Sequence, residues 1–195
     1  MQKLIIASGN AGKLREIQHL LQPLGIEAVP QSDFAVPEAE EPYVTFIENA
    51  LAKARHASRL TALPALADDS GICVDALNGA PGVFSARYAG EPKSDRRNNE
   101  KLLEALQSHE NRHAHYYCVM VLVRHADDPQ PLIAEGSWHG RVLDAPRGAG
   151  GFGYDPVFLD PASGLTAAEL PAARKNRTSH RGRAIVALRA RLGDV

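Results

Sequence analysis

The sequence predicts one mixed α/β domain over residues 1–195, and two observations carry this prediction. In the first half, short apolar runs alternate with amphipathic stretches, which is typical of strand–helix–strand units and parallel strand pairing. In the second half, two long apolar runs are separated only by the turn Asp127-Asp128-Pro129-Gln130, which predicts an antiparallel hairpin. Parallel units followed by a hairpin give a mixed sheet.

The individual elements follow from spacing and from capping signals. Leu14, Ile17 and Leu21 recur at helical spacing, Thr45 and Glu48 form a capping box, and Asp95 is expected to cap a third helix. The sequence thus predicts helices at residues 13–21, 45–60 and 95–107 and after residue 182, and strands at residues 3–7, 26–29, 114–124 and 132–138. Residues 65–74 are expected to form two short buried strands separated by a turn.

Composition excludes several classes of protein. A net charge of −1 leaves no broad basic surface, so nucleic acid is not an expected partner. No apolar stretch approaches the roughly 18 residues that cross a bilayer, and the N-terminus lacks a signal-peptide pattern, so no membrane partner and a cytoplasmic location are expected. The two cysteines, Cys73 and Cys118, lie inside apolar runs and are interpreted as buried thiols.

Two adjacent carboxylates, Asp68 and Asp69, are held between the apolar runs of residues 65–74 and are followed by Ser70. Two like charges side by side cost free energy unless a proton or a cation offsets them. Hard oxygen ligands suit Mg²⁺, which makes a metal site one interpretation. The alternative is a simple turn at the end of a strand, with no role in chemistry.

A second candidate is the loop Ser8-Gly9-Asn10-Ala11-Gly12-Lys13, which joins the first predicted strand to the first helix. Strand, glycine-rich loop and helix together direct backbone N–H groups and the positive helix end toward an anion. The spacing matches neither a Walker loop nor a dinucleotide fingerprint. The loop is therefore a candidate phosphate site, and a plain connection is the alternative. Lys53 is a candidate second phosphate contact, or a solvated lysine.

The acidic stretch of residues 33–41 could supply a further metal ligand from Glu40 or Glu41, or it could be a solvated loop. Near the C-terminus, positive residues precede the last helix, where they oppose its dipole and so do not serve helix stability. These are Lys175, His180 and Arg181. Both Arg181 and Lys175 offer donors to a ring carbonyl.

The loop of residues 148–156 has four glycines in six positions around an aromatic pair. Its candidate site residues are Phe152, Gly153, Tyr154 and Asp155. An aromatic ring in so open a backbone can stack on a planar base, and Asp155 can accept from a base or ribose or join a metal site. A flexible loop with Phe152 in a minor cluster is the alternative.

Six motifs occur in a characteristic order, namely Ser8-x-Asn10-x-x-Lys13, Phe46-x-Glu48-Asn49-Ala50, Ala67-Asp68-Asp69-Ser70-Gly71, Gly82-Val83-Phe84-Ser85-Ala86-Arg87-Tyr88, Gly151-Phe152-Gly153-Tyr154-Asp155-Pro156 and Ser179-His180-Arg181. Together they resemble the inosine triphosphate pyrophosphatase family, in its bacterial dITP/XTP branch. The resemblance implies a long mixed central sheet with flanking helices, two lobes around a substrate cleft, and a homodimer.

The resemblance also implies an activity, which is Mg²⁺-dependent hydrolysis of dITP, ITP and XTP to the monophosphate and pyrophosphate. By motif position, Asp69 would be the general base and a metal ligand, with Glu40, or alternatively Glu41, as the second ligand. Residues 8–13 would hold the phosphates and Ser70 would contact substrate. The base pocket would comprise residues 152–155, Lys175, His180 and Arg181.

Two other functions stay open at this point. One is a sensor that binds a nucleotide without cleaving it, although carboxylates beside phosphates would not help a pure anion binder. The other is a related pyrophosphatase for modified pyrimidine nucleotides. A donor from Arg181 or Lys175 would favour a purine with a carbonyl at C6, because against adenine it would stay unpaired, at a cost of about 1–3 kcal/mol.

Overall fold

The structure is a computed structural model that describes residues 3–192. Its strands are β1 (Lys3–Ile6), β2 (Glu27–Pro30), β3 (Ala65–Val74), β4 (His113–Val123), β5 (Leu132–Val142), β6 (Phe158–Asp160) and β7 (Leu165–Thr166). Its α-helices are α1 (Ala11–Leu21), α2 (Phe46–Thr61), α3 (Asp95–Ala105), α4 (Ala172–Thr178) and α5 (His180–Leu192). Short 3₁₀ helices lie at Gln22–Leu24, Gln31–Phe34, Asp75–Leu77 and Gly82–Arg87.

The strands form one seven-stranded sheet in the order β2-β1-β3-β4-β5-β6-β7. β1 pairs in parallel with both β2 and β3, whereas β6 is antiparallel to β5 and to β7. The N–H of Val142 at the end of β5 donates to the carbonyl of Arg112, just before β4, at 2.9 Å, as expected for the predicted hairpin. The mixed sheet with flanking helices confirms the predicted fold class.

The described residues divide into two compact units. Unit 1 contains residues 3–69, 118–136 and 180–192, and unit 2 contains residues 70–117 and 137–179. Strands β3, β4 and β5 each contribute residues to both units. Within the described part of the chain, no helix is long and apolar enough to span a bilayer.

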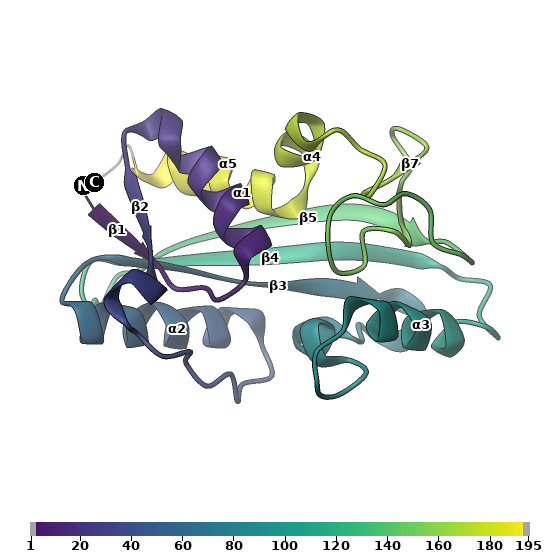
Figure 1. Cartoon of the computed structure of the whole chain (residues 1–195), viewed down its shortest axis with the longest axis horizontal. Helices are drawn as coiled ribbons and strands as arrows, with labels where there is room; N and C mark the ends of the chain where they lie inside the picture. Colours follow the sequence, from purple (N-terminus) through teal and green to yellow (C-terminus); the bar gives the residue numbers. More distant parts are fainter. Residues whose placement is uncertain (1–2, 193–195) are drawn as a thin grey trace. The chain divides into compact units, whose positions relative to one another are not determined.

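The core of unit 1 lies between the sheet and two helices that cover the same face of it, α1 and α5 (Figure 1). Its fully buried side chains include Leu4, Ile17, Leu66 and Leu188. Helix α2 covers the other face and is buried through small residues, Ala50, Ala54 and Ala57. The sheet segment in this unit is therefore buried on both faces, as is usual for parallel strands.

Unit 2 has an aromatic core. The Trp138 and Phe158 rings meet edge to face at 5.0 Å between centroids, and the Tyr116 ring lies 4.7 Å from that of Phe158. Leu102 and Leu106, in and just after α3, complete this cluster. Aromatic pairs of this kind stabilise a fold by more than the burial of their apolar surface alone would.

The prediction of two strands and a turn at residues 65–74 is wrong. β3 runs without interruption through Asp68, Asp69 and Gly71. A side chain at Gly71 would meet the carbonyl of Gly82 at 2.3 Å and the Ser85 hydroxyl at 2.4 Å. The glycine in this strand therefore allows a close backbone approach and does not mark a turn. Because successive strand residues point to opposite faces, the two carboxylates are separated.

Gly71→Ala is expected to destabilise the protein by about 1–3 kcal/mol, as overpacking of a close contact does. The Gly82 carbonyl belongs to the backbone and cannot move aside as a flexible side chain would. Chemical denaturation of the variant and the parent checks this expectation. An unchanged midpoint would show that the contact between β3 and the Gly82 turn is not as tight as described.

The start of α3 also differs from the prediction. Ser94, and not Asp95, is the N-cap, since its side chain accepts from the Arg97 N–H. Asp95 lies in the first turn, and its carboxylate accepts from the N–H of Gly153 at 2.7 Å. Asp95, which the sequence suggested as the helix cap, therefore holds the glycine-rich loop of unit 2 through its hydrogen bond with Gly153.

Candidate active site

The loop between β1 and α1 is held by its own side chains. Asn10 caps α1, and its side-chain oxygen accepts from the N–H groups of Gly12 at 2.9 Å and Lys13 at 3.0 Å. The Ser8 hydroxyl accepts from the Asn10 N–H at 3.3 Å. A side chain at Gly9 would fall 2.0 Å from a carboxylate oxygen of Glu38. This predicted phosphate loop is therefore a fixed helix N-terminus with an acidic side chain against it.

Asp68 faces α1 and α5 and is 1% exposed. The Lys13 ammonium lies 3.1 Å from its Oδ2, and Nη2 of Arg181 lies 3.5 Å from the same atom. Burial alone would raise the pKa of Asp68, but the charges of Lys13 and Arg181 hold that pKa well below its usual range. Asp68 is thus a permanent carboxylate, and it forms an ion pair with Lys13, the lysine of the predicted phosphate loop.

Asp69 points to the opposite face, toward α2. Its Oδ2 accepts from the side-chain amide of Asn49 at 3.3 Å, and its Oδ1 accepts from the Lys53 ammonium at 3.4 Å. Asn49 is buried and exchanges two further hydrogen bonds with the backbone of Tyr43, both at 3.2 Å. Asn49 therefore fixes the Asp69 carboxylate and also the end of the acidic loop.

The pKa of Asp69 is raised, first by burial, and then by the negative charges of Glu41 and Asp68. Lys53 and Lys13 oppose this shift. Burial would lower the pKa of Lys53, yet the neighbouring carboxylates, Asp69 foremost, raise that pKa above its usual value. A raised pKa keeps the Lys53 ammonium charged, and it makes Asp69 a stronger base than an exposed aspartate.

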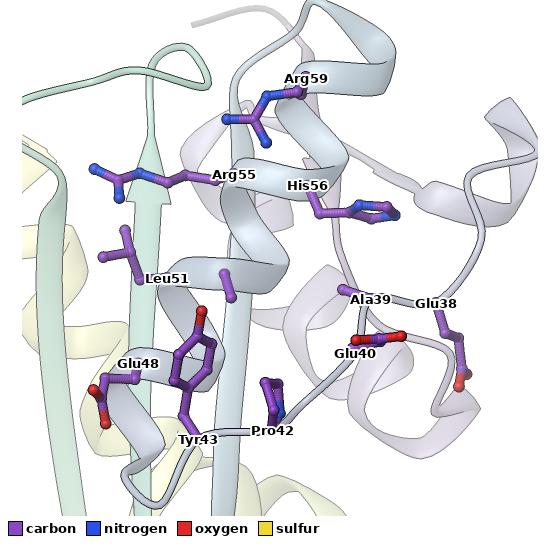
Figure 2. Close-up of a pocket in the computed structure, with 11 residues that line it drawn as sticks. Glu38, Ala39, Glu40, Pro42, Tyr43, Glu48, Leu51, Arg55, His56 and Arg59 are labelled. Carbon is purple, nitrogen blue, oxygen red and sulfur yellow. The ribbon is translucent and has the colours of Figure 1, made fainter.

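The carboxylates of the acidic loop have different neighbours. Glu41 accepts from the Lys53 ammonium at 2.6 Å, and Glu38 lies against Gly9. Glu40 is exposed and, together with Glu38, lines a cavity of about 760 Å³ on the outer face of α2. Arg55 and Arg59 line the same cavity, and in Figure 2 their side chains extend away from these two glutamates. Of the two alternatives raised by the sequence, Glu41 is the one that shares a cation with Asp69.

Among residues 3–192, no group of three or more His, Cys, Asp or Glu side chains could hold a metal ion by itself. Asp69 and Glu41 offer two carboxylates around one ammonium. Magnesium usually keeps several waters and takes one or two protein carboxylates together with substrate phosphates. The donor set fits Mg²⁺ bound with a nucleotide, and does not fit a fully protein-bound ion.

Arg181 lies in the first turn of α5 and is 2% exposed. Its Nη1 donates to the carboxylate of Glu16 in α1, and its Nη2 to Asp68. His180, beside it, is also buried. No pattern in the sequence pointed to Glu16, because a glutamate within an amphipathic helix is ordinary. In the structure it joins α1 to α5 through the arginine.

The other predicted base-pocket residues belong to unit 2. The Lys175 ammonium lies 2.6 Å from Oδ2 of Asp155 and 4.7 Å from the centroid of the Phe152 ring. Asp155 also accepts from the Phe152 N–H at 2.9 Å and from the Tyr116 hydroxyl at 3.4 Å. Lysine, carboxylate and aromatic ring therefore form one compact cluster, and its role in binding a base stays a prediction.

Two further residues of the glycine-rich loop have structural contacts. Tyr154 is 3% exposed, and its hydroxyl donates to the Ser85 carbonyl at 2.8 Å. Gly153 is held from both sides, by Asp95 at its N–H and by Asn99 at its carbonyl, at 2.7 and 2.8 Å. Asn99 and Asp95 were not predicted as part of this loop, since both lie far from it in sequence.

Ser70, a further predicted site residue, is half-buried and follows Asp69 in β3.

The predicted site residues thus fall into two sets. Unit 1 contains residues 8–13, Glu40, Lys53, Asp69, His180 and Arg181, and unit 2 contains Ser70, residues 152–155 and Lys175. A profile of the Ham1 family matches residues 4–191. The chain belongs to the Ham1 family. This membership agrees with the resemblance drawn from the six motifs.

Individual Ham1-family relatives match along nearly the whole chain. A dITP/XTP pyrophosphatase of Ralstonia nicotianae is 64% identical, covering 98% of this chain and 97% of the relative. A dITP/XTP pyrophosphatase of Chromobacterium violaceum is 66% identical over 97% of this chain and 96% of the relative. Among solved structures, a HAM1 protein from Coxiella burnetii superposes with a TM-score of 0.93 at 49% identity, covering 100% of both chains.

Proposed function

We propose that this chain is a dITP/XTP pyrophosphatase, which hydrolyses dITP, ITP and XTP to the monophosphate and pyrophosphate. The two relatives of that name described above align over 97% or more of this chain at 64% and 66% identity. The observation that carries the mechanism is the Asp69 carboxylate, buried in β3 and held by Asn49 and Lys53.

Phosphate binding is assigned to the loop of residues 8–13 at the N-terminus of α1. The positive end of the helix attracts an anion, which would compete with the Asn10 side chain for the N–H groups of Gly12 and Lys13. Lys13 and Lys53 bring two ammonium groups toward the carboxylate pair, one on each face of β3. An incoming polyphosphate would share Lys13 with Asp68, and the charge of Arg181 would keep that carboxylate neutralised.

Asp69 and Glu41 would hold Mg²⁺ together with the phosphates. The bound ion would supply charge neutralisation for the polyphosphate and the leaving pyrophosphate. Glu40, the ligand first suggested by motif position, lines the outer cavity of α2, and we propose Glu41 in its place. We also propose, from the family resemblance, a cytoplasmic homodimer, which light scattering would detect as twice 21.0 kDa.

Asp69 would act as the general base. Its raised pKa makes it a better proton acceptor than an exposed aspartate, and Asn49 and Lys53 fix the direction of its oxygens. A water held by Asp69 would attack the α-phosphorus and give its proton to the carboxylate. The new oxygen–phosphorus bond forms as the bond from that phosphorus to the bridging oxygen breaks, and pyrophosphate leaves.

Base selection is assigned to unit 2. The Lys175 ammonium, set between Phe152 and Asp155, can donate to the carbonyl at C6 of hypoxanthine or xanthine while the ring stacks on Phe152. Adenine carries an amino group at that position and would leave the donor unpaired. Arg181 was predicted to share this role, but we propose that it positions Asp68, because both its terminal nitrogens contact carboxylates.

A substrate panel tests the proposal. We expect pyrophosphate release from dITP, ITP and XTP with Mg²⁺, much slower release from dATP and ATP, and little without the metal. Lys175→Met removes the proposed donor to the base. We expect it to lower the preference for dITP over dATP, measured as the ratio of their kcat/KM values, by about tenfold or more. Tight ITP binding with no product at any Mg²⁺ concentration would instead indicate a nucleotide sensor.

A further inference from the structure

Two histidines face each other across neighbouring strands of unit 2. His115 lies in β4 and His139 in β5, with 5.3 Å between the ring centroids and 31° between the ring planes. Their sequence neighbours Tyr116 and Trp138 point into the aromatic core. Because strand side chains alternate, both imidazoles project from the opposite face of this sheet segment, half-buried for His115 and exposed for His139.

The surroundings of His115 favour a neutral ring that has a lone pair to offer. Its pKa is lowered, first by burial and then by the nearby His139, and both effects favour the neutral ring. The negative charge of Asp75 acts on the same ring in the opposite direction and would attract a cation. Cys73 also lies near Asp75, and burial raises the pKa of its thiol, which keeps it protonated.

We propose that His115 and His139 form a two-imidazole site for a borderline divalent transition metal, of the Cu²⁺, Ni²⁺ or Zn²⁺ class. Imidazole suits these ions, whereas the carboxylates of Asp69 and Glu41 suit Mg²⁺. Directly opposed side chains on adjacent strands are close enough for one ion to bridge both rings.

The site supplies two protein ligands and leaves the remaining positions to water. Within residues 3–192 no third His, Cys, Asp or Glu joins such a group. Structural zinc sites use four protein ligands, so this ion would bind reversibly and would not be needed for folding. Protons compete for the same lone pairs, and binding should weaken as the pH falls through the histidine range.

The test uses the full chain, in excess Mg²⁺ to occupy the carboxylate site, with Cu²⁺ as the probe because it binds imidazole most strongly of the three. Calorimetry would give the affinity, and electron paramagnetic resonance would count the coordinating nitrogens. For the parent we expect one strong equivalent with two nitrogens. Loss of one ring turns a chelate into a single ligand, so His115→Ala and His139→Ala should each bind about 100-fold more weakly.

His113→Ala is the matched control, because His113 is exposed and lies two residues from His115, on the same face of β4. It should bind Cu²⁺ as the parent does. His115→Gln replaces the half-buried ring if the alanine variant is unstable, and Mg²⁺-dependent hydrolysis confirms that each variant is folded. Parent-like Cu²⁺ affinity in His139→Ala, or a one-nitrogen spectrum for the parent, would overturn the proposal.

Discussion

Asp69→Asn is expected to lower kcat for dITP by about 10²- to 10⁴-fold, the range that a general base usually contributes. Asparagine keeps the size of the side chain but cannot take the proton of the attacking water. Binding of a non-hydrolysable dITP analogue, measured by calorimetry, should be largely unchanged. In the parent enzyme, kcat should fall as the pH drops through the raised pKa of Asp69, because the protonated acid is no base.

Two neighbouring glutamates provide the controls for this variant. Glu41→Gln should raise the Mg²⁺ concentration needed for half-maximal activity, because Glu41 lies beside Lys53 and Asp69. Glu40→Gln should leave it unchanged, since Glu40 lines the outer cavity of α2 (Figure 2). Parent-like turnover by Asp69→Asn would remove Asp69 from the mechanism, and a Mg²⁺ effect at Glu40 alone would reverse the ligand assignment.

Asp68→Asn is expected to cost about 3–5 kcal/mol of unfolding free energy, the usual result of breaking a buried ion pair from one side. It would leave the buried Arg181 guanidinium with one carboxylate in place of two, and Lys13 without its partner. Urea denaturation at neutral pH measures the effect. Glu27→Gln is the control, because its 3.8 Å pair with Lys3 is exposed and should contribute less than about 1 kcal/mol.

The same variant has a predicted pH dependence. The pKa of Asp68 in the folded protein lies below its unfolded value of 3.8, so the carboxylate stabilises the fold above that pH. This contribution is lost as the pH falls from 3.8 toward the folded pKa. The stability difference between parent and Asp68→Asn should therefore narrow in acid. A difference that is small at neutral pH, or that widens in acid, would contradict the described ion pairs.

Local patterns in the sequence predicted most of the elements correctly. Thr45 does cap α2, its hydroxyl accepting from the Glu48 N–H at 3.3 Å, and the strand–loop–helix at residues 3–21 has the expected bounds within two residues. The exception with the largest consequence is β3. A glycine after two acids is usual in a turn, and only the tertiary contact of Gly71 with the Gly82 turn explains an unbroken strand.

The candidate site was less predictable, because its partners are distant in sequence. Arg181 and Glu16 are 165 positions apart, and Lys175 and Asp155 are 20 apart. A positively charged residue at a helix start indicates some anionic partner, but it does not distinguish a ligand from a buried carboxylate. The order of the motifs selected the candidate residues, whereas the role that we propose for Arg181 follows from its contacts with Glu16 and Asp68.

Hydrolysis of dITP in H₂¹⁸O tests the central claim most directly, because it reports which phosphorus the water attacks. If Asp69 directs water at the α-phosphorus, the label must appear in dIMP, and the released pyrophosphate must carry none. Mass spectrometry of the products after a single turnover decides the question. Label in pyrophosphate, or release of orthophosphate, would contradict the proposed attack.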